Sequence, residues 1–245
     1  MFSENHKTAV YCNNVSYVYP DGTQALKNIN FRLLPGEKAA IIGPNGAGKS
    51  TFLQLLNGIK RPQGEIKIFE TLLSEKNLRN IKTHVGLVFQ NPDDQLFCPT
   101  IFDDLAFGPV NLGMKEDETE SRVTKALMDV GLQGYEKRSS LHLSYGERKL
   151  AAIASILTMN PWLIAMDEPT SNLDPLHRRK IIQWINRSNL TCLLTTHDMD
   201  MITETCQKVV LFNKGQVMAE GETKKILKDK KLLEENDLEL PLKWQ

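Results

Sequence analysis

The sequence contains few of the features that mark disulfide-bonded, zinc-binding or membrane-spanning proteins. Its cysteines form no CxxC pair and have no nearby histidines at ligand spacing, so we expect reduced, mostly structural thiols at Cys12, Cys98, Cys192 and Cys206. No run of about 18 apolar residues occurs, which argues against a membrane-spanning helix. The N-terminal residues MFSENHKTAV also lack the long apolar stretch of a secretion signal, so we expect the protein to remain in the cytosol.

The sequence also lacks an excess of charge of either sign. Its 245 residues include 30 basic and 30 acidic side chains, which predicts no general attraction to nucleic acid or to anionic lipid. We therefore expect no nucleic-acid partner. Apolar residues make up 41% of the chain, enough for one large domain or for a core with a subdomain.

Hydrophobic patterns divide the chain into strand-rich and helix-rich parts. Alternating residues over 10–19, followed by a turn at 20–22, predict a small antiparallel β layer. Residues 92–161 contain helical segments separated by breakers such as Gly113 and Gly131, which predicts a helical insertion.

Short apolar runs at residues 38–42, 162–166 and 191–195 predict buried strands, and a helical pattern lies between the last two. This alternation is typical of an α/β fold with a mainly parallel sheet. We predict one domain over residues 1–245. Its parts are a core with the β subdomain (1–90 and 162–220), a helical subdomain (91–161) and a helical tail (221–245).

A phosphate-binding loop is predicted between the strand at 38–42 and the helix that begins at Lys49. The pattern GxxxxGK[ST] is formed by Gly43, Pro44, Asn45, Gly46, Ala47, Gly48, Lys49 and Ser50. Glycines allow the main-chain N–H groups to surround a phosphate, and the helix N-terminus adds partial positive charge. Lys49 should reach the β and γ phosphates and Ser50 should bind Mg²⁺, with Thr51 next to them in the nucleotide site. Kinases, GTPases and motor ATPases share this loop, so by itself it predicts only binding of a nucleoside triphosphate.

Two carboxylates end the apolar run at residues 163–166. Asp167 and Glu168 would lie at the carboxyl edge of a parallel sheet, where ligands bind. We expect Asp167 to hold Mg²⁺ through water. Glu168 would orient and deprotonate the attacking water, a general-base role that contributes about 10²–10⁴-fold.

The residues LSYGE at 143–147 precede a long helical run over 148–159. At this point the sequence resembles the ATPases of the ABC transporter family, whose signature reads LSGGQ. The resemblance covers nearly the whole chain in order, with Gln90 at the Q-loop position, SNLD at 171–174 as the D-loop and His197 as the switch histidine. It implies a P-loop NTPase core with an N-terminal antiparallel β subdomain and an inserted α-helical subdomain.

The resemblance implies that two ATPase domains pair head to tail and that each ATP lies between the phosphate loop of one and the signature of the other. Ser144 can cap the signature helix while the helix N-terminus faces the γ phosphate. Ser144 and Gly146 in the signature and Asp174 in the D-loop belong to the implied nucleotide site. ATP would therefore join two chains, and its hydrolysis would weaken their contact.

The resemblance also implies roles for three side chains around the phosphates and the base. Gln90 would touch Mg²⁺ or the attacking water, and His197 would contact the γ phosphate. Tyr19 resembles the aromatic residue that stacks on adenine, and Tyr17 is the alternative. The expected ligands are thus ATP and Mg²⁺, the latter held by Ser50, Gln90 and Asp167.

The signature departs from the family pattern at two positions. Tyr145 occupies a usual glycine, which requires its side chain to point away from the nucleotide, and Glu147 replaces glutamine. Ser144 and Glu147 form the pattern SxxE, so Glu147 is explained as part of a capping box.

The residues that follow Gln90 indicate a particular kind of ABC subunit. The stretch QNPDDQLF at 90–97, with FGP at 107–109 and NLG at 111–113, is similar to the ATPase subunits of energy-coupling-factor importers, most of all the cobalt and nickel branch. Such subunits are peripheral proteins on the cytoplasmic face of the cell membrane. They dock on a transmembrane coupling protein beside a substrate-binding membrane protein. The candidate contacts here are Asp93, Asp94, Leu96 and Phe97.

Several alternatives stay open at this stage. The second ATPase subunit is either another copy of this chain or a similar second chain, and the imported substrate is a cobalt or nickel ion, biotin or another vitamin. A soluble ABC ATPase of an assembly or repair system is the alternative function. A kinase or GTPase would have no use for the signature and the D-loop.

Overall fold

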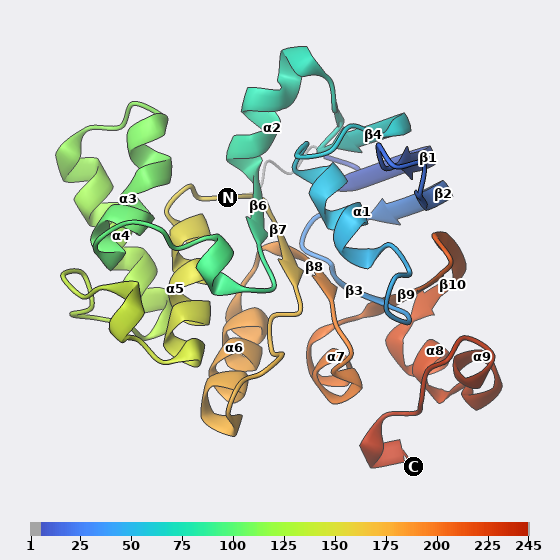
Figure 1. Cartoon of the computed structure of the whole chain (residues 1–245). Helices are drawn as coiled ribbons and strands as arrows, with labels where there is room; N and C mark the ends of the chain where they lie inside the picture. The colour runs from blue at the N-terminus through green and yellow to red at the C-terminus, as the bar shows by residue number, and fades with distance from the viewer. Residues whose placement is uncertain (1–5, 245) are drawn as a thin grey trace.

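The computed structural model describes residues 6–244, which form two β-sheets and the helices that pack on them (Figure 1). Residues 1–5 lie outside the described residues. They are half of the N-terminal segment MFSENHKTAV, which was predicted to lack a secretion signal. Gln245, the last residue of the predicted tail, also lies outside the described residues. Among residues 6–244, no helix is both long and apolar enough to cross a membrane.

The first sheet is antiparallel and has the strand order β2-β1-β4-β5. These strands are β1 (Val10–Val18), β2 (Gln24–Leu33), β4 (Gln63–Ile68) and β5 (Thr71–Leu72). Buried and exposed side chains alternate along much of β2, because one face of the sheet packs on the core and the other faces solvent. The predicted antiparallel β layer is confirmed.

The second sheet has the order β10-β9-β3-β8-β7-β6. Its strands are β3 (Lys38–Ile42), β6 (Val85–Val88), β7 (Leu163–Asp167), β8 (Thr191–Thr195), β9 (Lys208–Asn213) and β10 (Gln216–Glu222). Only β10 runs antiparallel to its neighbour. Strand β7 begins and ends one residue later than predicted and includes Asp167. The α/β fold with a mainly parallel sheet is confirmed.

Alternate residues of the central strands pack into two different apolar clusters. In β7, Ile164 and Met166 contact one cluster, whereas Leu163 and Ala165 contact the other. The first cluster contains residues of the helices α6 (Pro175–Arg187) and α7 (Met199–Thr205). The second contains residues of α1 (Lys49–Leu56), α2 (Leu78–His84) and the antiparallel sheet. Since both faces of the parallel strands are covered, their carboxyl ends are held rigidly.

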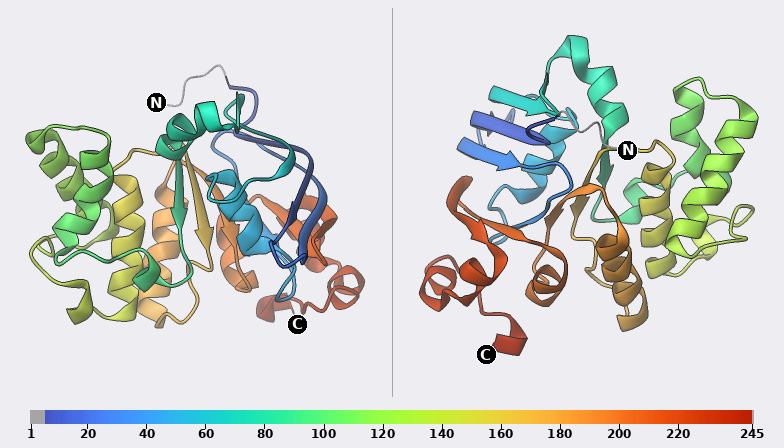
Figure 2. Two further views of the ribbon diagram at one scale, coloured as in Figure 1. Left: turned by 45° about the horizontal axis from the view of Figure 1, so that its top comes forward. Right: turned by 180° about the vertical axis from the view of Figure 1, so that it is seen from behind.

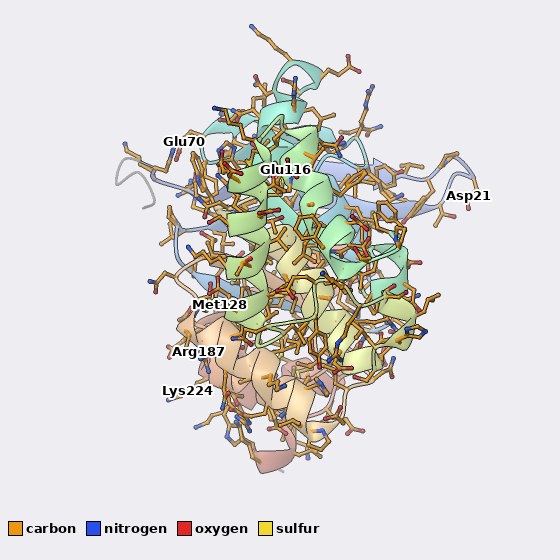
Figure 3. All side chains as sticks on the ribbon, turned by 90° about the vertical axis from the view of Figure 1, so that its left-hand side faces the viewer. Asp21, Glu70, Glu116, Met128, Arg187 and Lys224 are labelled. Carbon is orange, nitrogen blue, oxygen red and sulfur yellow. The ribbon has the colours of Figure 1, made fainter. Side chains whose placement is uncertain are left out.

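Three helices form the predicted helical insertion: α3 (Ile101–Asn111), α4 (Glu116–Val130) and α5 (Tyr145–Leu157). They gather at one side of the molecule, and α5 lies nearest the sheet (Figures 1 and 2). Figure 3 faces this side, with Glu116 and Met128 at opposite ends of α4. The short helix η2 (Pro92–Asp94) joins β6 to this group.

The C-terminal tail contains two short helices, α8 (Thr223–Lys228) and α9 (Lys230–Glu234), and a final turn, η4 (Leu242–Trp244). The sequence pattern predicted one helix. The helical path is interrupted at Asp229, whose side chain instead accepts a hydrogen bond from the amide of Leu232 and caps α9.

Candidate active site

A cavity of about 570 Å³ opens at the carboxyl edge of the parallel strands and beside the antiparallel sheet. Most of the predicted site residues line it. They are Tyr19, Asn45, Gly46, Ala47, Gly48, Lys49, Ser50, Thr51, Gln90, Asp167, Glu168 and His197. The cavity is also lined by residues that were not predicted as site residues, namely Thr23, Gln24, Ala25, Ser171 and Asn172. A larger cavity of about 790 Å³, between α4 and the ends of α5 and α6, contains none of the predicted site residues.

The phosphate loop joins β3 to α1, and two of its glycines are required by the backbone. Gly48 has φ +96°, and a Cβ there would lie 2.6 Å from the carbonyl oxygen of Ala25. Gly43 has φ +149°, and its Cβ would lie 2.0 Å from the carbonyl oxygen of Phe212. Because no L side chain fits at either position, the glycines set the path that brings the loop to the start of α1.

The Lys49 ammonium lies over the phosphate loop. Its Nζ donates hydrogen bonds to the carbonyl oxygens of Gly43 at 2.7 Å and Pro44 at 3.0 Å, and it lies 3.3 Å from Nε2 of His197. The residue is buried, and this burial lowers the pKa of the ammonium from its ordinary value. Lys49 therefore contacts both the phosphate loop and the ring of His197.

The two carboxylates lie at the end of β7. The Thr195 hydroxyl of β8 donates to Oδ1 of Asp167. Glu168 adopts φ +45°, a left-handed conformation that is uncommon for a residue with a Cβ, and its amide donates to the carbonyl oxygen of Thr195 at 3.0 Å. Burial raises the pKa of Glu168, and its Oε1 is buried without a hydrogen-bond partner among residues 6–244. Such an atom is suited to accept a hydrogen bond from a bound molecule.

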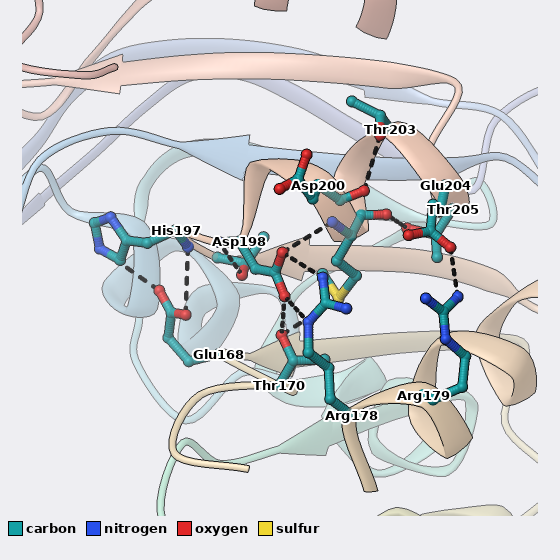
Figure 4. A network of polar contacts seen from close by, with 12 residues as sticks. Glu168, Thr170, Arg178, Arg179, His197, Asp198, Asp200, Thr203, Glu204 and Thr205 are labelled. Carbon is teal, nitrogen blue, oxygen red and sulfur yellow. Dashed lines mark hydrogen bonds and ion pairs between the residues drawn. The ribbon is translucent and has the colours of Figure 1, made fainter. Parts of the chain in front are cut away.

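His197 is positioned by the residue that follows it (Figure 4). Asp198 accepts two hydrogen bonds from Arg178, at 2.7 and 2.8 Å, and one from Thr170 at 3.1 Å. It also caps α7 by accepting from the amide of Met201. Burial and then the charge of Lys49 lower the pKa of His197, which favours a neutral imidazole.

The signature helix α5 begins outside the cavity. The Ser144 hydroxyl accepts from the Glu147 amide at 3.2 Å, and the Glu147 carboxylate accepts from the Ser144 amide at 2.8 Å. The predicted capping box is confirmed. At Gly146 a Cβ would lie 2.3 Å from the His177 ring, so this glycine allows α5 to pack closely on α6.

Asp174 also lies outside the cavity. It caps α6 by accepting from the amides of Leu176 at 2.9 Å and His177 at 3.1 Å, and its carboxylate lies 2.5 Å from Nδ1 of His177. Within one chain, therefore, Ser144 and Asp174 are exposed outside the cavity that the phosphate loop and the carboxylates line, and Gly146 is buried.

A family model described as "ABC transporter" matches residues 26–171, more than half of the chain. The chain belongs to the ABC transporter family. This ABC ATPase therefore binds and hydrolyses ATP, and the resemblance stated above from the motifs is confirmed.

The similarity of this ABC ATPase to known proteins extends over almost all of its length. It is 47% identical over 234 residues to the energy-coupling factor transporter ATP-binding protein EcfA of Methanothermobacter thermautotrophicus, covering 93% of this chain and 75% of the relative. It is 44% identical over 233 residues to a putative ABC transporter ATP-binding protein of Geobacter sulfurreducens, covering 95% of this chain and 94% of the relative.

Two solved structures share the fold. The structure of cbiO1 from Clostridium perfringens, described as part of the ABC transporter complex cbiONQ, matches with a TM-score of 0.82 and 35% identity over 94% of each chain. The ATP-binding cassette MJ0796, in a dimeric structure with ADP and Pi, matches with a TM-score of 0.78 and 28% identity, covering 87% of this chain and 98% of that one.

Of the two candidate adenine-stacking tyrosines, Tyr19 lines the cavity of this ABC ATPase and Tyr17 does not line it. The Tyr19 hydroxyl lies 2.8 Å from that of Thr51, and the Lys60 ammonium lies 4.7 Å from the centre of its ring. The ring of Tyr17 meets Tyr19 edge-on, 5.1 Å away between centroids. Tyr19 thus stays the preferred prediction, with Tyr17 supporting its ring.

One of the predicted partner contacts is wrong. Leu96 is only 6% exposed, because its side chain packs into the apolar cluster that contains the helical insertion. Its neighbour Phe97 is 67% exposed and meets the ring of Phe107 edge-on at 5.2 Å. Of these two adjacent apolar residues, Leu96 lies in the core and Phe97 lies at the surface. The sequence pattern did not reveal this difference.

The donor atoms of Ser50, Gln90 and Asp167 suit Mg²⁺, because this ion prefers oxygen ligands and is usually held by one or two carboxylates plus substrate phosphates and water. Residues 6–244 contain no group of three or more His, Cys, Asp and Glu side chains that could hold a metal alone. Because Mg²⁺ is usually held together with substrate phosphates, Ser50, Gln90 and Asp167 fit an ion that binds with its nucleotide.

Proposed function

We propose that this ABC ATPase is the ATP-hydrolysing subunit of an energy-coupling-factor importer on the cytoplasmic face of the cell membrane. The observation that carries the proposal is the division of the site. Lys49, Glu168 and His197 line one cavity, whereas Ser144 at the signature helix lies outside it. One chain thus supplies only one part of the expected nucleotide site, and a second ATPase subunit supplies the rest.

In the proposed reaction, the loop amides and Lys49 hold the β and γ phosphates of ATP. Ser50, Gln90 and Asp167 hold Mg²⁺, which would neutralise charge on the phosphates. Glu168 orients the attacking water through its unpaired Oε1 and accepts its proton, a role that the raised pKa of this carboxyl supports. His197, held beside Lys49, contacts the γ phosphate through its ring.

The signature surface completes the site from the other subunit. The N-terminus of α5 carries partial positive charge and the exposed hydroxyl of Ser144, which suits it to the γ phosphate of ATP bound to the partner. Asp174 lies at the start of α6 on the same surface. The dimeric form of the similar cassette MJ0796 supports such a pair, formed here by two copies or by this chain and a similar second one.

The membrane partners in this proposal are a transmembrane coupling protein and a substrate-binding membrane protein. Phe97, Phe107 and Val110 form an exposed apolar surface, and the acidic residues Asp93 and Asp94 precede it in the chain. Aromatic anchors of this kind are frequent at protein interfaces. The cargo class in this proposal is a cobalt or nickel ion, ahead of a vitamin, because the residues QNPDDQLF at 90–97 resemble the cobalt and nickel branch most.

In this ABC ATPase, we propose, a single domain consists of a core with the β subdomain (1–90 and 162–220), a helical subdomain (91–161) and a helical tail (221–245). In this scheme the segment 91–161 carries both the signature and the docking surface. One subdomain therefore contacts the partner ATPase and the membrane proteins.

Purification of the tagged chain from its native membranes tests the proposal. We expect it to be extracted by detergent together with at least two integral membrane proteins and to hydrolyse ATP in that complex. Reconstituted vesicles should then take up cobalt or nickel, measured as an isotope, only when ATP is on the ATPase side. A chain found alone in the soluble fraction would contradict the importer and favour an assembly factor.

A further inference from the structure

The first turns of α5 contact the segment that leaves β6 through three residues of one helical face. Tyr145, Arg148 and Lys149 are spaced by three and four positions, so their side chains project to the same side. All three reach residues that follow the end of β6.

Lys149 is buried completely, and its ammonium contacts main-chain oxygens. Its Nζ donates to the carbonyl oxygens of Gln90 at 2.6 Å, Phe89 at 3.0 Å and Asp167 at 3.4 Å. A buried charge is unfavourable unless it is hydrogen-bonded, so these bonds strongly constrain where the lysine can lie. Lys149 therefore joins the signature helix to the ends of two adjacent strands, β6 and β7.

Tyr145 reaches the same oxygen. Its hydroxyl donates to the carbonyl of Gln90 at 3.3 Å, so this one carbonyl accepts from two side chains of α5. The glycine that usually stands at position 145 has no such donor. The departure from the signature pattern thus adds a contact within the chain.

Two further contacts attach the rest of the segment to α5. Arg148 forms an ion pair with Asp93 at 3.0 Å, and its guanidinium lies 5.8 Å from the centre of the Tyr145 ring. Gln95 donates to the carbonyl of Ala152 at 2.7 Å. The segment from Phe89 to Gln95 therefore follows the helix over more than one turn.

We infer that Tyr145 and Lys149 are positioning residues that join the signature helix to the main chain of Gln90, so that Ser144 and Gln90 move as one unit. This inference rests on the proposed function, in which Gln90 contacts the bound nucleotide and Ser144 contacts the nucleotide of the other subunit. A shift of Gln90 toward the phosphates in one site then reorients the helix tip that enters the other site. Neither residue contacts ATP itself in this role.

Loss of the contacts of Tyr145 and Lys149 with Gln90 should weaken the pairing of two subunits but not the binding of ATP to one chain. Without the link, one chain still binds ATP through its own phosphate loop, because neither side chain lines the cavity. The signature helix, however, is no longer held in the orientation set by Gln90. Pairing and turnover fall while the affinity of the single chain for ATP stays unchanged.

The experiment compares Tyr145→Phe and Lys149→Met with two controls away from this contact, Tyr11→Phe on the half-buried β1 and Lys125→Met on the exposed side of α4. Three quantities are measured: binding of a fluorescent ATP analogue to the unpaired chain, ATP-driven pairing in a Glu168→Gln background, and kcat and KM for ATP. Loss of a neutral hydrogen bond predicts about threefold weaker pairing and lower kcat for Tyr145→Phe. Loss of the charged donor predicts a decrease of about tenfold or more for Lys149→Met.

In both variants the dissociation constant of the analogue and the KM for ATP stay within about twofold of wild type. If Lys149→Met does not fold, Tyr145→Phe decides, since it removes one oxygen and keeps the ring over Arg148. If a folded Tyr145→Phe variant pairs and turns over like wild type, the inference is overturned and the proposed function is left intact. The same holds if this variant loses only affinity for ATP. A wild-type chain that neither pairs nor hydrolyses ATP would overturn both.

Discussion

The Nε2 atom of His197 lies between two groups of opposite charge, 3.3 Å from the Lys49 ammonium and 3.6 Å from Oε1 of Glu168. Because an ammonium only donates, the contact with Lys49 favours an unprotonated Nε2. The main-chain amide of His197 also donates to the second oxygen of Glu168 at 3.4 Å (Figure 4). The main chain of the histidine thus bonds to the proposed base, while its ring lies beside the lysine of the phosphate loop.

Replacement of Glu168 by glutamine tests the base. The amide keeps the size of the side chain but cannot accept the proton of water, so the rate of phosphate release should fall by about 10²–10⁴-fold. ATP binding should persist, and the chain should accumulate as an ATP-bound dimer on gel filtration. Glu118→Gln, at an exposed ion pair on α4, is the control and should keep normal turnover. Turnover near wild type in Glu168→Gln would assign the base elsewhere.

Two replacements of Ser144 separate helix capping from the contact with a second subunit. Asparagine and aspartate are both good N-caps, so both variants should fold with stability within about 1 kcal/mol of wild type. Only aspartate adds a negative charge where the γ phosphate of the partner's ATP would lie. Ser144→Asp should therefore abolish ATP-driven pairing, whereas Ser144→Asn should reduce it less.

Analytical ultracentrifugation with ATP in the Glu168→Gln background measures this difference. Binding of ATP to the single chain should be equal in both Ser144 variants. Equal pairing of the two variants would argue against a phosphate at this helix tip.

The lowered pKa of His197 predicts how stability depends on pH. In the folded chain the imidazole binds its proton at lower pH than in the unfolded chain, whose value is near 6.5. As the pH falls below that value, the unfolded state takes up the proton first, so this group reduces the stability of the fold. Urea unfolding from pH 7.5 to 5.5 should show a smaller loss of stability in His197→Gln than in wild type. His142→Gln, at an exposed site, is the control, and an unchanged slope in His197→Gln would contradict the assignment.

The exposed aromatic surface should bind the membrane partners. Phe97→Asp introduces a charge into this apolar surface, and we expect loss of co-purification with integral membrane proteins while ATP binding by the isolated chain persists. Met218→Asp alters an exposed apolar residue on β10 and serves as the control. Normal co-purification of Phe97→Asp would move the docking site elsewhere.

The chemistry of the loop and of the strand ends was readable from local patterns. A phosphate loop is contiguous in the chain, and its glycines are required by backbone geometry at Gly43 and Gly48. The capping box at Ser144 and Glu147 is equally local, since both residues lie within one helical turn. The loop backbone and the capping box depend on neighbours in sequence, which is why the sequence predicted both.

Other site features depend on contacts between distant segments. Thr195 bonds to Asp167 across two strands, and Lys149 reaches the ends of both β6 and β7. Neither residue belongs to a motif, so no sequence pattern indicated its role. The only local signal for Lys149 was its place, next to Arg148, at the start of an apolar helical run.

The amino-acid sequence by itself determined the family and the order of the motifs, and it predicted most of the residues that line the cavity, because each motif is a short segment whose geometry is set by its own backbone. Tertiary structure alone decided which side of each segment is buried. It placed Leu96 in the core and Phe97 at the surface, and it brought Tyr145 and Lys149 onto the carbonyl of Gln90. The physical reason is that burial and long-range hydrogen bonds arise only when strands and helices pack together, and no single segment encodes its neighbours.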